Sequence, residues 1–211
     1  MLRRFAGRPY ALAAAGGLLL AAFYAVAGDT YAGLGSVTIA QALSGTARIA
    51  VLAFAAKIFA TAVTLETGGS GGIVTPIFFI GATGGAALAS LAHLPPGVFG
   101  AFGLVAVLAA AANTPLAAAV MGMELLPGDV GVYAALCGGA AYLIVGHRSV
   151  YASQKLGFSK SAGLDVRLGV PIGEIDRRAF RVRPGSLTER ALPRRPPRVH
   201  AEPARREPDS E

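Results

Sequence analysis

A long uncharged stretch constrains this sequence more than any other feature. From Thr67 to Met123 there is no Asp, Glu, Lys or Arg. A helix needs roughly 20 mostly apolar residues to cross the hydrocarbon core of a bilayer, so this stretch has room for two spans or several shorter ones. Charged residues make up 15% of the chain, against about a quarter in soluble domains. We therefore predict an all-α integral membrane protein.

Positive charge gathers at the two ends of the chain. Arg3, Arg4 and Arg8 precede the first apolar segment, and 14 of the 19 basic residues lie from Arg148 onward. Lys and Arg beside apolar spans mark the cytoplasmic side, so we expect a multi-pass protein of the cell membrane with both termini cytoplasmic. Because these basic residues flank a membrane block, the net charge of +7 does not predict nucleic-acid binding.

Turns and breaks divide the chain into helical segments. The predicted helices cover residues 9–27, 31–44, 48–65, 73–93, 97–112, 116–126 and 129–145. Residues 9–27 are interpreted as a first membrane helix rather than a signal peptide, because more apolar segments follow. The break at Asn113-Thr-Pro115 separates two half-length helices, a pattern typical of transporters in which irregular backbone lines a cavity.

The composition changes after these helices. Residues 1–157 form the predicted membrane domain, and residues 158–211 form a basic, Pro- and Arg-rich tail. Such a tail buries little apolar surface, so we predict that it is disordered and cytoplasmic, in contact with anionic membrane lipid.

Lys57 is the single charge in the middle of the predicted helix over residues 48–65. An ionisable residue inside the membrane is costly and is therefore a functional candidate. A structural interpretation also exists, in which the side chain snorkels to the surface or pairs with Glu66. The residues alone leave both interpretations open.

The glycine-rich turn at residues 67–72 leads straight into a helix with Pro76 in its first turn, a position where the missing N–H costs nothing. A helix N-terminus carries unpaired amides and a partial positive charge. Inside a membrane such an end must find a partner, and an anion is a natural one. An ordinary tight turn between two spans would produce the same pattern.

Three motifs resemble the CLC family of chloride channels and transporters. Gly71-Gly-Ile-Val-Thr-Pro-Ile-Phe-Phe-Ile-Gly-Ala82 is similar to that family's Gly-Gly-Ile-Phe-x-Pro motif. An Ala-rich segment with a Pro-Leu break that ends near Glu124 resembles the next element. Gly146-His-Arg-Ser-Val-Tyr151 resembles the start of the last intramembrane helix. The resemblance implies the second inverted repeat of a CLC-type fold, with broken and re-entrant helices.

The same resemblance implies the residues of an anion site. In the family, the amides of the two residues after the glycines hold the anion, which here are Ile73 and Val74, with Gly72 and Thr75 beside them. Tyr151 is the implied side-chain ligand, although by itself it would be an interfacial aromatic anchor. The bound species would be chloride or another halide, with no cofactor, no metal and no enzymatic chemistry.

Two departures from the family pattern shape the functional prediction. The sequence also resembles a bacterial branch that includes fluoride/proton antiporters, but those carry an acidic residue where this chain has Ile73, which favours chloride. The first-repeat motifs Gly-Ser-Gly-x-Pro and Gly-Arg-Glu-Gly-Pro do not occur in the sequence, and neither Glu66 nor Glu124 takes the place of the gating glutamate.

We therefore predict that this chain supplies the second half of the pore of a voltage-gated chloride channel or chloride/proton antiporter. A separate chain would carry the first repeat, and the assembly would be a homodimer. The alternatives are a fluoride/proton antiporter of the same family and a truncated membrane fragment that conducts nothing.

Overall fold

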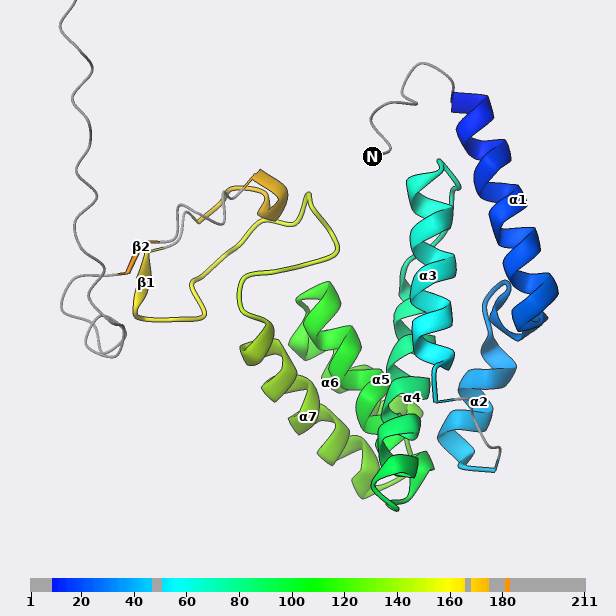
Figure 1. The fold of residues 1–211 in the computed structure, drawn as a ribbon. Coiled ribbons are helices and arrows are strands. Elements are labelled where there is room, and N and C mark those ends of the chain that lie inside the picture. The colour runs from blue at the N-terminus through cyan, green and yellow to red at the C-terminus, as the bar shows by residue number, and fades with distance from the viewer. Residues whose placement is uncertain (1–8, 47–50, 166–167, 175–180, 183–211) are drawn as a thin grey trace, which may run out of the picture.

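A computed structural model describes residues 9–46, 51–165, 168–174 and 181–182, and these residues are mainly helical (Figure 1). The α-helices are α1 (Pro9–Ala27), α2 (Ser36–Ser44), α3 (Ala53–Glu66), α4 (Val74–Leu91), α5 (Pro96–Ala112), α6 (Pro115–Leu125) and α7 (Asp129–Val145). The short elements are η2 (Asp29–Tyr31), β1 (Leu164–Asp165), η3 (Ile172–Glu174) and β2 (Arg181–Val182). The prediction of an all-α membrane region is confirmed, since the two-residue strands lie beyond the last α-helix.

The antiparallel pair of α4 and α5 forms the centre of the helical region. Glycines bring the two backbones together: a Cβ on Gly81 would lie 2.5 Å from the carbonyl oxygen of Gly103, and a Cβ on Gly85 would overlap the carbonyl of Phe99. Small residues of this kind let membrane helices pack closely, which replaces the hydrophobic driving force that is missing in lipid. The contact fixes the register of the pair.

Helices α6 and α7 pack on one side of this pair and also use small residues. A Cβ on Gly131 of α7 would lie 2.9 Å from the carbonyl oxygen of Gly122 in α6, and Gly138 of α7 faces Val105 of α5. The buried core is correspondingly rich in alanine, with Ala101, Ala109, Ala112, Ala118 and Ala134 among its members.

Helices α1 and α3 lie side by side on the other side of the core (Figure 1). Gly16 is the buried residue of α1 and sits against Thr67, while most of the helix faces outward. By length and composition, α1 and α4 could each cross a membrane. Helices α5 and α7 have 17 residues and α6 has 11, so they are shorter than the roughly 20 residues of a full span.

The predicted break between two short helices is confirmed. Asn113 ends α5 in the left-handed region at φ 57, and Thr114 at φ −130 precedes Pro115, the first residue of α6. Asn is among the few non-glycine residues that adopt this conformation readily.

The prediction that Gly146 to Tyr151 begins a last intramembrane helix is wrong. Gly146 has φ 67 and ends α7, and residues 146–163 contain no helix. The amide of Val150 donates to the carbonyl of Ala111 at 2.8 Å, so the segment is tied to the end of α5.

Part of the predicted tail is described and makes hydrogen bonds across the expected domain boundary. The amide of Gly169 donates to Leu156 at 2.9 Å, and that of Ile172 donates to Gln154 at 2.8 Å. Residues 183–211, which hold most of the tail predicted to be disordered, lie outside the described residues. The division at residue 157 stays a prediction.

We predict that Gly85→Ala destabilises the protein by about 1–3 kcal/mol, the usual cost of overpacking a tight core. The matched control is Gly84→Ala, because a Cβ there would lie 3.8 Å from its nearest neighbour, Phe54. Alanine favours a helix over glycine by about 1 kcal/mol, so the control should be neutral or stabilising. Thermal unfolding in detergent, followed by circular dichroism, measures both; equal midpoints would contradict the close α4–α5 contact.

Candidate functional site

The start of α4 is an uncapped helix end. Gly68, at φ 88, turns the chain after α3, and the amide of Gly69 closes that helix by donating to Thr64 at 2.8 Å. Ile73 is the N-cap residue of α4 and provides no side-chain cap. Within the described residues, the amides from Gly71 to Thr75 donate no hydrogen bond outside the helix. The positive end of the α4 dipole therefore lacks a partner from this part of the chain.

The two glycines before α4 face open space. A Cβ on Gly71 or Gly72 would meet nothing within 4 Å, and neither residue has a positive φ. Val74, the first residue of the helix, is 40% exposed. Neither backbone conformation nor packing within the described residues requires glycine here, so the space fits something that approaches from outside this segment.

Tyr151 lies at the same end of the α4–α5 pair. The register that places Gly81 opposite Gly103 brings the start of α4 level with the end of α5, and Val150 is bonded to Ala111 at that end of α5. The Tyr151 side chain is 37% exposed, and its hydroxyl makes no hydrogen bond with a described residue. It is free to meet a ligand, and its role as a ligand stays a prediction.

Lys57 is buried in the core of the protein, with 3% of its surface exposed. Its Nζ donates hydrogen bonds to the carbonyl oxygens of Tyr31 at 3.0 Å and Gly33 at 2.6 Å, and lies 5.2 Å from the centroid of the Phe79 ring. Lys57 therefore neither snorkels to the surface nor pairs with Glu66, and two backbone carbonyls hold it instead. A functional role for this residue stays a prediction.

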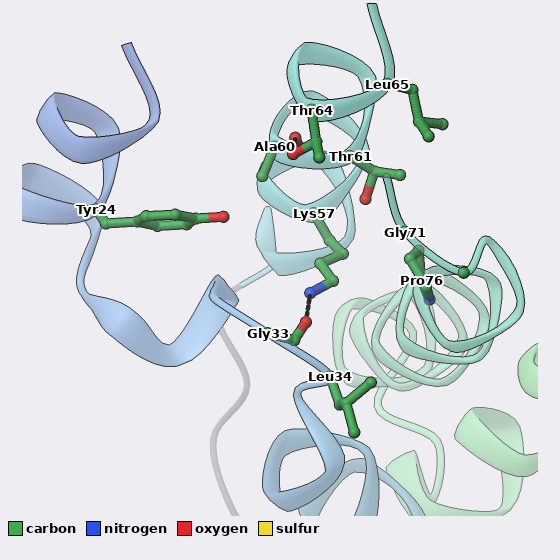
Figure 2. Close-up of a pocket in the computed structure, with 11 residues that line it drawn as sticks. Tyr24, Gly33, Leu34, Lys57, Ala60, Thr61, Thr64, Leu65, Gly71 and Pro76 are labelled. Carbon is green, nitrogen blue, oxygen red and sulfur yellow. Dashed lines mark hydrogen bonds between the residues drawn. The ribbon is translucent and has the colours of Figure 1, made fainter. Parts of the chain in front are cut away.

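A pocket of about 270 Å³ adjoins both Lys57 and the glycines of the α4 motif. Figure 2 shows its residues coming from several elements around one space. The lining includes Tyr24 from α1, Lys57, Thr61 and Thr64 from α3, and Gly71 and Gly72 before α4. The pocket thus places a buried cation beside the predicted anion motif.

Some of these residues carry a sequence signal and others do not. Thr61 and Thr64 follow Lys57 by four and seven residues, so their position on one face of a helix could have been found from spacing. The carbonyls of Tyr31, at the end of η2, and of Gly33, just after it, are backbone groups, so their position could not have been found from side-chain spacing. Tyr24 comes from a helix whose packing on α3 has no signature in the sequence.

The described residues contain no cluster of side chains that could bind a metal ion. No group of three or more His, Cys, Asp or Glu side chains could hold a metal ion there. Cys137, the single cysteine, is a free thiol within α7. The arrangement offers hydrogen-bond donors and positive charge, which recognise an anion.

Comparison with known proteins matches this chain to one family. Residues 1–146 match the family model described as voltage gated chloride channel. A "Chloride/fluoride channel protein" from Pseudomonas syringae pv. tomato (strain ATCC BAA-871 / DC3000) is 45% identical over 160 residues, covering 72% of this chain and 34% of that protein. The chain therefore spans about a third of the length of that relative. No solved structure matches the chain.

We predict that the loop carrying Tyr151 becomes more stable as the pH rises from about 8. Lys160 fastens this loop to α7: its Nζ donates to the carbonyl of Tyr142 at 2.8 Å, and its amide donates to Nε2 of His147 at 2.9 Å. Burial lowers the pKa of Lys160 from 10.5 to about 8.

Between about pH 8 and pH 10.5, the two pKa values of Lys160, the unfolded chain binds more protons than the folded one. The free energy of unfolding therefore increases as the pH rises through this range and decreases again as the pH falls. Thermal unfolding between pH 7 and 9.5 should show this rise in wild-type protein and in the exposed-lysine control Lys155→Gln, and a smaller rise in Lys160→Gln. An identical pH dependence in all three would contradict the burial of Lys160.

Proposed function

Because the chain belongs to the voltage-gated chloride channel family, we propose that it takes part in moving a halide anion across the membrane. The observation that carries the proposal is the uncapped start of α4, where the amides from Gly72 to Thr75 are unpaired within the described residues. An anion there would receive several N–H donors and the favourable end of a helix dipole.

The proposed binding mode is electrostatic and involves no covalent step. A partly dehydrated halide rests on the amides of Ile73 and Val74, with Gly72 and Thr75 beside it and the Tyr151 hydroxyl closing the shell. Peptide dipoles attract the ion less strongly than a full positive charge in direct contact would. This supports both selectivity and release, because conduction requires binding that is favourable but reversible.

Chloride is the proposed substrate, with fluoride as the second candidate. The residue after the two glycines is Ile73, which carries no acidic group to donate or relay a proton at this position. Fluoride stays a candidate because the similar protein from Pseudomonas syringae is named a chloride/fluoride channel protein. The proposed transport is passive, as in a channel, or coupled to protons, as in an antiporter, and the gate that decides between the two lies outside the three motifs.

The rest of the pore is proposed to come from a first repeat that lies outside this sequence. The working unit is proposed to be a homodimer in the cell membrane, with the basic tail on the cytoplasmic side. Exposed apolar side chains on α6 and α7 support a contact with lipid or a second subunit: Leu116, Val120, Met123, Val132, Leu136 and Ile144.

Anion efflux from liposomes tests this function. We predict that the chain, reconstituted alone or together with a first-repeat partner, releases chloride and that Tyr151→Phe changes the rate by removing one hydroxyl donor. Fluoride efflux is measured in parallel to separate the two substrates. Efflux that never exceeds that of protein-free liposomes, with or without the partner, would favour the non-conducting fragment.

We predict that Ile73→Pro weakens halide binding by about 10- to 100-fold, because it deletes one N–H donor to an ion and such bonds contribute about 1.5–3 kcal/mol. Ile73 has φ −89 and precedes the first helical residue, so proline is tolerated there better than inside the helix. The control Ile73→Ala shortens the side chain but keeps the N–H. Equal chloride affinities of the two variants in calorimetry would show that this amide holds no anion.

A further inference from the structure

Lys57 is a buried cation with no acidic partner among the described residues. Its two hydrogen bonds go to neutral carbonyl oxygens of Tyr31 and Gly33, and no Asp or Glu lines the pocket beside it. A buried charge without an opposite charge is costly, because carbonyl dipoles recover only part of the lost hydration. An ammonium group has three N–H donors, so one remains after these two bonds.

Several other groups that line the pocket are donors without a partner among the described residues. The hydroxyls of Tyr24 and Thr61 make no hydrogen bond with a described residue, and the amides of Gly71 and Gly72 donate none. Figure 2 shows Tyr24 and Thr61 on different sides of Lys57. Two acceptors at the pocket are already occupied: Gly33 accepts from Lys57 at 2.6 Å and Ala60 accepts from Thr64 at 2.8 Å.

We propose that this pocket binds a small monovalent anion, such as a halide, on the ammonium group of Lys57. The position is separate from the one at Ile73 and Val74, neither of which lines the pocket. The inference deepens the proposed function and rests on it, because it adds a second anion position beside the first. Gly72 adjoins both positions and would connect them.

The size of the pocket determines how much water the bound ion keeps. A volume of about 270 Å³ accommodates a halide with several waters, since each water occupies about 30 Å³ in the liquid. The anion is therefore held by direct contact with the Lys57 ammonium group, by the hydroxyl donor of Thr61 and by water elsewhere. The two carbonyls already bonded to Lys57 reduce its net attraction, which keeps the ion exchangeable.

This arrangement gives Lys57 a role that differs from that of the helix end. A fixed positive charge concentrates anions in its neighbourhood, whereas the neutral amides at the start of α4 select among them. Loss of Lys57 should therefore lower the occupancy of the pocket and the supply of ions to the amides, while leaving the amides in place.

Bromide calorimetry on the full chain in detergent tests the proposal. We expect Lys57→Met to raise the bromide dissociation constant by at least about tenfold, since it removes a charge–charge contact in a partly buried site. Lys155→Met is the matched control, because Lys155 is exposed, and it should bind bromide like the wild type. Equal dissociation constants for wild type and Lys57→Met would overturn the proposal, and so would an equal loss in both variants.

Thr61→Val provides a second variant that keeps the charge and nearly the shape, in case Lys57→Met does not fold. It should weaken bromide binding several-fold by removing one hydroxyl donor, and an unchanged affinity would count against the pocket. Failure of the proposed function gives a different result. In that case wild-type liposomes release no halide, while bromide binding still depends on Lys57.

Discussion

The close contact of α4 with α5 determines how the start of α4 and the Tyr151 loop lie relative to each other. Gly81 and Gly85 of α4 meet the backbone of α5 directly, and a side chain at either position would push the helices apart. The resulting register brings the start of α4 level with the end of α5. Because Val150 is bonded to the end of α5, the loop that carries Tyr151 is held at the same end of the pair.

Two positive features of the protein converge on one region without a negative partner among the described residues. One is the uncapped start of α4, and the other is the buried ammonium group of Lys57. Soluble proteins commonly satisfy such features with a capping side chain or a carboxylate. Here neutral carbonyls and open donors occur instead, which is the arrangement expected where a mobile anion completes the charge balance.

Much of the helical framework could be predicted from the sequence because apolar segments and breaks are strong local signals. The bounds of α1 and α7, and the break at Asn113 to Pro115, agree with the predictions. A short helix was expected within residues 31–44, and α2 forms there but begins only at Ser36, after Gly35 in the left-handed region.

The parts that escaped prediction depend on tertiary contacts. The partners of Lys57 are backbone carbonyls, which side-chain patterns do not reveal. The segment from Gly146 to Tyr151 was expected to be helical by resemblance, but its Val150 amide bonds to Ala111, which lies far away in sequence. No local pattern reveals such a bond.

Chloride titration of the isotope-labelled chain, followed by backbone amide NMR in micelles, would show directly whether the start of α4 holds an anion. The amides of Gly72, Ile73 and Val74 should shift and reach saturation. The amide of Val130 at the start of α7 should not, because it is already bonded to Pro127 at 3.3 Å. Shifts of equal size at the two helix starts, or none at either, would contradict an anion site at α4.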